Sequence, residues 1–214
     1  MFNKMAHRNT QSLFVLMVTF LFCNQIFAQS SSLKFEFENP IIVDSTSTIV
    51  IPISYNTNYF SNNKIANWEN LYANLIFYNF VTDSSKRLFE HNTYILNVYN
   101  RYETFYNKKP NRNFTKQHFF CRVKNVDYND NGKIDEYDPA ILYVCDIYGN
   151  NLRALTSTSE NVESFEIFEK LNFAMIKIQR DANDDHDFRN SENDYYYVKL
   201  DLKTLTFGKK IEIK

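Results

Sequence analysis

Glycine and cysteine are both scarce in this chain, with three residues of each among 214. Gly132 and Gly149 lie in polar stretches whose residues favour turns, so each marks a specific turn. Cys23 falls in an apolar segment near the start of the sequence, which leaves Cys121 and Cys145 elsewhere. Two cysteines do not make a disulfide scaffold. They either pair in an oxidising compartment or remain buried thiols.

An excess of either charge is also missing, since 24 basic and 25 acidic residues give a formal net charge of −1. A nucleic-acid partner usually requires a basic stripe, and the lysines and arginines here are scattered. His91, His118 and His186 share no metal-ligand spacing, which argues against zinc. The sequence has no Gly-x-Ser-x-Gly elbow, phosphate loop or catalytic Cys–His signature.

One apolar run, residues 13–22, stands out, and it is too short to span a bilayer. Lys4 and Arg8 precede this run and Ala28 follows it, which is the pattern of a secretory signal peptide over residues 1–28. A core helix, an N-terminal anchor and lipidation of Cys23 are the alternatives. We therefore expect a secreted protein, periplasmic or extracellular, with residues 29–214 forming one domain and no transmembrane segment.

Residues 127–138 alternate oxygen-bearing side chains with spacers, and Gly132 stands at the sixth position of the twelve. A calcium ion takes six to eight oxygen ligands, which a short loop supplies by such alternation. The spacing is that of the EF-hand calcium loop. It predicts a Ca²⁺ site in which Lys133 contributes its backbone carbonyl, with the side-chain ligands Asp127, Asn129, Asn131, Asp135 and Asp138.

A second loop repeats the first 54 residues later, because Asp181 corresponds to Asp127. His186 replaces the glycine, and Arg189 occupies a ligand position that it cannot serve. Asp130 and Asp184 are expected to add negative charge rather than metal bonds. The second loop predicts a further Ca²⁺ site with the ligands Asp181, Asn183, Asp185, Asp187 (through its carbonyl) and Glu192.

Runs of aromatic and β-branched residues predict an all-β protein. Pro52 cannot donate a hydrogen bond to a neighbouring strand, so its strand is expected at a sheet edge. Cys121 and Cys145 are expected on neighbouring strands of one sheet, because the metal loop between them folds back as a hairpin.

Residues 141–156 have a hydrophobic strand that ends in Asp146, a turn containing Gly149, and a short Leu-Arg-Ala-Leu-Thr strand. This segment resembles the closing hairpin of a TolB-type β-propeller blade, and weaker echoes follow Leu75 and Tyr197. The resemblance implies two to three antiparallel blade-like sheets, at about residues 33–91, 117–156 and 163–213. Three blades are too few to close a propeller. We expect an open or incomplete propeller-like arrangement, with a sandwich as the alternative.

These observations favour a secreted, calcium-binding, non-catalytic structural or interaction module with a protein or glycan partner. The alternative is a secreted hydrolase, for example one that acts on glycans, with an acidic site that the sequence does not reveal.

Overall fold

The computed structural model describes residues 34–43, 46–56, 71–99, 117–189 and 194–212. Its contacts separate residues 1–33 from residues 34–214, and the fold below is that of the second unit. The expected signal peptide and Cys23 lie outside the described residues. The described part of the chain contains strands and one short 3-10 helix, η4 (Glu169–Leu171), and no α-helix. The prediction of an all-β fold is confirmed.

The strands form two antiparallel sheets, one of nine strands and one of four. The larger sheet contains two groups, because β4 and β6 are joined by the single register pair Tyr72↔Ile95. Its first group is β1 (Phe35–Phe37), β2 (Ile41–Ile42), β3 (Thr48–Tyr55), β4 (Tyr72–Asn79) and β5 (Ser84–Arg87). Its second group is β6 (Tyr94–Tyr99), β7 (His118–Lys124), β8 (Ile141–Asp146) and β9 (Arg153–Ala154). The smaller sheet is β10 (Glu160–Phe168), β11 (Phe173–Arg180), β12 (Tyr195–Asp201) and β13 (Phe207–Glu212).

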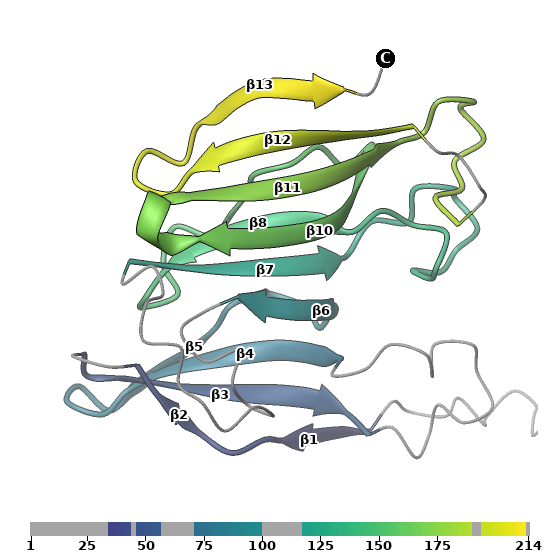
Figure 1. Cartoon of the computed structure of the whole chain (residues 1–214). Helices are drawn as coiled ribbons and strands as arrows, with labels where there is room; N and C mark the ends of the chain where they lie inside the picture. The colour runs from purple at the N-terminus through teal and green to yellow at the C-terminus, as the bar shows by residue number, and fades with distance from the viewer. Residues whose placement is uncertain (1–33, 44–45, 57–70, 100–116, 190–193, 213–214) are drawn as a thin grey trace, which may run out of the picture. The chain divides into compact units, whose positions relative to one another are not determined.

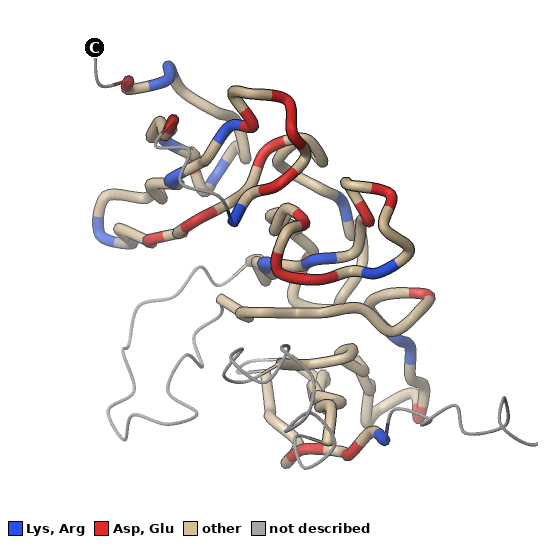
Figure 2. Tube along the Cα trace, turned by 90° about the vertical axis from the view of Figure 1, so that its right-hand side faces the viewer, with Lys and Arg blue, Asp and Glu red and all other residues tan. Residues whose placement is uncertain are grey.

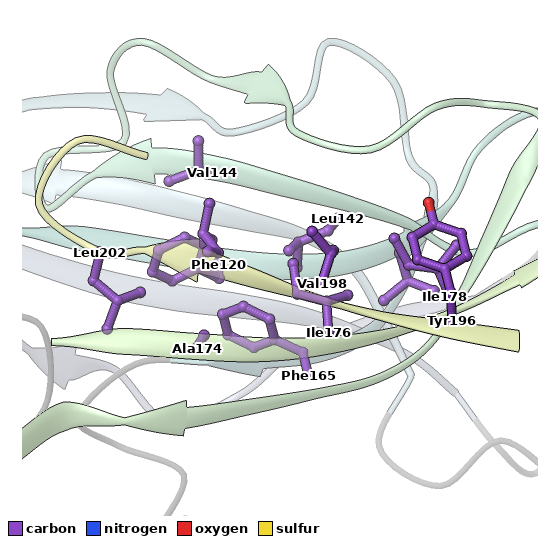
Figure 3. Close-up of a cluster of buried hydrophobic side chains, with 12 residues drawn as sticks. Phe120, Leu142, Val144, Phe165, Ala174, Ile176, Ile178, Tyr196, Val198 and Leu202 are labelled. Atoms are coloured by element: carbon purple, nitrogen blue, oxygen red, sulfur yellow. The ribbon is translucent and has the colours of Figure 1, made fainter. Parts of the chain in front are cut away.

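The middle group, β6–β9, lies between the other two (Figure 1). Its strands β7 and β8 have buried residues on both faces, whereas β9 is exposed. On one face, Phe120 and Leu142 pack with Ile176 of β11 in a single hydrophobic cluster. The labelled side chains of this cluster point toward one another from the two sheets in Figure 3. On the other face, Phe119 packs with Phe77 of β4 at a centroid distance of 5.4 Å. Adjacent residues of β7 are both buried because side chains alternate between the faces of a strand.

Each strand group ends in a hairpin whose turn is fixed by an amide or carboxylate side chain. Asn79 accepts hydrogen bonds from the backbone N–H of Val81 and Thr82. The Asp146 carboxylate accepts from the turn that leads to β9, and the Asp201 carboxylate from the turn that leads to β13. This local bonding by Asn and Asp competes with the strand ladder and ends it.

The expectation that Pro52 lies in an edge strand is wrong. β3 pairs with β4 on one side and with both β1 and β2 on the other. Residues 38–40 separate β1 from β2 and lie opposite Pro52, so neither strand pairs with β3 at this position. The proline is tolerated for this reason. There the proline needs no N–H, and its carbonyl accepts a bond of 2.9 Å from Glu38 N.

Cys121 and Cys145 lie on the neighbouring strands β7 and β8, which confirms the predicted placement. Both are free and buried. Cys121 is paired in register with Tyr143, and Cys145 with Phe119, so the two cysteines are diagonal neighbours. Diagonal Cα atoms are about 7–8 Å apart, whereas a disulfide usually needs less than about 7 Å. The structure thus favours thiols over a disulfide.

We expect both thiols to resist alkylation by iodoacetamide in the folded protein and to react after unfolding. Burial raises the pKa of Cys121 to about 12, so the reactive thiolate is scarce at neutral pH. Mass spectrometry of peptides that contain Cys121 and Cys145, alkylated with and without urea, measures this. A peptide carrying a Cys121–Cys145 disulfide would contradict the expectation.

Candidate metal centre

Two acidic loops connect the second and third strands of their groups. Loop 1, residues 127–138, joins β7 to β8, and loop 2, residues 181–192, joins β11 to β12. Figure 2 shows their acidic residues close together on one side of the molecule. Residues 190–192 of loop 2 lie outside the described residues, and the expected ligand Glu192 is among them. Every other expected ligand residue lies in a described segment.

The backbones of the two loops adopt positive φ angles at equivalent positions. The φ angle is 54° at Asp130 and 81° at Gly132, and it is 59° at both Asp184 and His186. A positive φ is uncommon for residues other than glycine, although Asn, Asp and His adopt it several-fold more often than most. The histidine therefore adopts the conformation that glycine has in loop 1.

The first aspartate of each loop holds the following backbone in the same way. Asp127 Oδ1 accepts from Asn131 N at 3.1 Å and its Oδ2 from Gly132 N at 2.8 Å. In loop 2, the two oxygens of Asp181 accept from the fifth and sixth residues of the loop, both at 3.1 Å. Each carboxylate lies inside the curve of its own loop as a result.

Further oxygens accept bonds from the backbone N–H two residues on. This pattern holds the side-chain oxygens against the backbone of their own loop, and Lys133 takes part as a backbone N–H donor. The acceptors in loop 1 are Asn129, Asn131 and Asp135, and those in loop 2 are Asn183, Asp185 and Asp187.

Asp138 closes loop 1 from a fully buried position. Its carboxylate accepts from Tyr128 N at 2.8 Å and from Asp135 N at 2.7 Å. Burial raises the pKa of Asp138, and the two backbone donors oppose that rise. Nearby, Lys124 Nζ donates to the carbonyls of Asp135 and Glu136 at 3.0 Å each. Burial lowers the pKa of Lys124 to about 8, although the carboxylate of Asp138 favours its charged form.

Tyr128 links loop 1 to loop 2. Its hydroxyl donates to Asp181 Oδ2 at 3.3 Å, so a residue of one loop contacts a candidate ligand of the other. Its ring lies 4.6 Å from that of His186 and 5.5 Å from that of Phe188 between centroids. Burial and the neighbouring Asp181 carboxylate raise the pKa of Tyr128.

A second link joins the distal halves of the loops. Phe188 N donates to Tyr137 O at 3.1 Å. The guanidinium of Arg189 lies 3.9 Å above the Tyr137 ring and 3.1 Å from Glu136 Oε1. Sequence reasoning noted only that Arg189 cannot bind a metal, and it missed both tyrosines. No sequence signal pointed to these contacts, because they depend on how the two sheets pack.

Three side chains of loop 2 are arranged so that they could hold a metal ion. Asp181, Asp184 and His186 each offer one ligand atom, and these atoms lie within 4.8 Å of one another. The His186 Nε2–Asp184 Oδ1 distance is 3.6 Å. Within the described segments, no other group of three acidic, histidine or cysteine side chains does so. From the sequence, Asp184 was interpreted as a source of negative charge and His186 as a departure from the calcium-loop pattern. Both residues are therefore additions to the candidate site.

No family model and no curated protein sequence matches the chain. Two solved structures show a weak likeness that concerns the fold alone. One is an oligogalacturonate lyase in complex with manganese, with a TM-score of 0.41, 10% identity, and coverage of 75% of this chain and 37% of that structure. The other is a cobalt-substituted ACO from Synechocystis, with a TM-score of 0.31, 10% identity, and coverage of 84% and 34%. The chain thus spans about a third of the length of either.

The oligogalacturonate lyase is an enzyme, and this finding contradicts our expectation of a non-catalytic protein. We withdraw that expectation. At a TM-score of 0.41, the likeness says nothing about which reaction or substrate, if any, belongs to this chain.

The described part of the chain contains no helix with the length and apolar character that a membrane span needs.

Proposed function

We propose that this protein is a secreted calcium-binding module whose two acidic loops form a paired cation site. The observation that carries the proposal is the matched arrangement of the loops. Asp127 and Asp181 accept the same two backbone hydrogen bonds, and the positive φ angles fall at equivalent positions of the two loops. Such matching favours one common role for the two loops.

Ligand chemistry favours calcium. Carboxylate, amide and carbonyl oxygens suit hard cations, and flexible sets of six to eight of them suit Ca²⁺ better than Mg²⁺. In loop 1 we assign Asp127, Asn129, Asn131, Asp135, Asp138 and the carbonyl of Lys133. In loop 2 we assign Asp181, Asn183, Asp185 and the carbonyl of Asp187. Glu192 is proposed as a further ligand from the sequence alone, because it lies outside the described residues. Asp184 and His186 lie beside the Asp181 carboxylate.

The pairing of the loops indicates a structural role for the cation. Loop 2 joins β11 to β12 and loop 1 joins β7 to β8, so the contact of Tyr128 with Asp181 bridges the two sheets. A cation that neutralises the carboxylates of one loop also reduces their repulsion with the carboxylates of the other loop, which this bridge holds nearby. We infer that calcium stabilises the packing of the smaller sheet on β6–β9, which then serves as a scaffold for a protein or glycan partner.

Millimolar calcium is expected to raise the melting temperature by a few degrees, and magnesium is expected to raise it less. A ligand that binds only the folded state adds about 2.7 kcal/mol of stability at a concentration one hundred times its Kd. Extracellular calcium modules have Kd values on the order of 10⁻⁴ to 10⁻³ M, so the effect at millimolar calcium is smaller than this. Thermal unfolding with calcium, with magnesium and with a chelator measures the shift.

Variants distinguish the two loops. Asp127→Ala is expected to remove more of the calcium-induced shift than Asp181→Ala, because loop 1 fits the ligand spacing better. Glu166→Gln, on the exposed side of β10, removes one carboxylate outside the loops and serves as the matched control. Identical melting curves of the wild type with calcium and with chelator would show that the loops are polar turns without a metal.

A further inference from the structure

A second candidate site lies at the opposite end of β8 from loop 1. Loop 1 precedes Ile141, whereas the turn of the β8–β9 hairpin follows Asp146. This turn and the β4–β5 hairpin flank a solvent-open pocket of about 370 Å³. That volume falls in the range of about 300–1,000 Å³ that is usual for small-molecule sites. The residues that matter for its chemistry are Asn79, Ser84, Ser85, Lys86, Tyr148 and Asn150.

The walls of the pocket are fixed by hydrogen bonds. Asp146 Oδ1 accepts from Tyr148 N at 2.9 Å and from Asn150 N at 2.7 Å, which holds the turn. Lys86 of β5 donates to Asn150 Oδ1, so the two hairpins are connected across the pocket. The side chain of Phe77, which is 3% exposed, forms an apolar part of the lining. A pocket held in this way needs little rearrangement on binding.

The lining combines two features that a sugar ring requires. Hydroxyl and amide side chains both donate and accept hydrogen bonds, as the hydroxyls of a sugar do. At the same pocket, Tyr148 leaves 45% of its surface exposed, and an aromatic face packs well against the C–H face of a pyranose. Among the described residues, no carboxylate lines the pocket, and Lys86 is the one cation there. Because Lys86 already donates to Asn150 Oδ1, a neutral sugar fits this chemistry.

We propose that the pocket between the β4–β5 and β8–β9 hairpins binds a sugar residue of a glycan, with the pyranose ring against Tyr148. This inference makes a glycan the partner of the module proposed above, and the partner assignment rests on that proposal. It does not depend on the cation, because the pocket and the acidic loops occupy opposite ends of β8. Sugar binding and calcium binding can therefore be tested separately.

Titration of the ¹⁵N-labelled protein with glucose, galactose, mannose and N-acetylglucosamine, in separate NMR experiments, tests the proposal. At least one of these sugars is expected to shift the amide signals of Tyr148, Asn150 and Ser85 in a saturable way. Sorbitol, which has hydroxyls without a ring face, is expected to cause no saturable shift. The expected binding is the same with calcium and with chelator.

Three variants identify the ring of Tyr148 as the contact. Tyr148→Ala is expected to weaken sugar binding about tenfold or more, and Tyr148→Phe is expected to retain most of it. Tyr197→Ala is the matched control, because Tyr197 is 43% exposed and lies on β12, away from the pocket. Melting curves verify that each variant folds.

The proposal is overturned if none of the four sugars binds saturably, if sorbitol binds equally well, or if Tyr148→Ala binds like the wild type. Failure of the calcium proposal has a different signature. In that case calcium leaves the melting curve unchanged, while the Tyr148-dependent shifts remain.

Discussion

Replacing Asp138 by alanine is expected to lower the free energy of unfolding by about 3 kcal/mol or more, even with a chelator present. The substitution removes the acceptor of two backbone donors, Tyr128 N and Asp135 N, at a position that is fully buried. An unsatisfied buried donor costs about 1–3 kcal/mol. The change also deprives the buried ammonium of Lys124 of a nearby negative charge, which adds to the loss.

Urea unfolding monitored by far-UV circular dichroism measures this change. Asp138→Asn is expected to lose less, because the amide oxygen can still accept one of the two backbone bonds. Asp130→Asn is the matched control, since it removes the same charge from an exposed position of loop 1. If Asp138→Ala unfolds at the same urea concentration as Asp130→Asn, the two backbone bonds do not hold the loop together.

The strands and the positions of the acidic loops could be predicted because both depend on local sequence. Alternation of apolar and polar residues, as in Phe173–Arg180, has a period of two and specifies a strand with one buried face. The turns after Asp146 and Asp201 follow from side chains that bond to their own backbone. Such interactions span a few residues, so they leave a direct trace in the sequence.

Apart from the neighbouring strands β7 and β8, the positions of the strands within their sheets could not be predicted, because they depend on pairings between distant residues. Pro52 illustrates this difficulty. Its missing N–H indicates an unpaired backbone site, but an edge strand and a gap between two short neighbours satisfy that requirement equally well. An edge strand was predicted from the sequence, whereas the structure has a gap between the two short strands β1 and β2.

The pairing of the two loops was also beyond sequence reasoning. Tyr128 and Asp181 are separated by 53 residues and belong to loops of different sheets. Their contact depends on the packing of β8 against β10, and no spacing rule describes that packing. By contrast, the ligand-like spacing inside each loop is local, which is why the candidate ligands could be named and the tyrosines that surround them could not.

Substitution of Gly149 by alanine is expected to destabilise the protein by about 2–5 kcal/mol, more than the same change at Gly132. Both glycines have positive φ angles, 71° and 81°, which cost an L-residue about 1–2 kcal/mol. At Gly149 an added Cβ would also lie 2.6 Å from Phe77 Cδ2, whereas nothing lies within 4 Å of the equivalent atom at Gly132. Overpacking of this kind costs about 1–3 kcal/mol.

The comparison of the two variants isolates the steric contact, because the backbone strain is common to both. The ring of Phe77 is buried and packs edge-on against Phe119, so it cannot move away freely. Phe77→Leu shortens the side chain and should restore part of the stability lost in Gly149→Ala. A double-mutant cycle measured by urea unfolding gives this coupling. Equal losses for Gly149→Ala and Gly132→Ala, with no coupling to Phe77→Leu, would show that the β8–β9 turn does not press against β4.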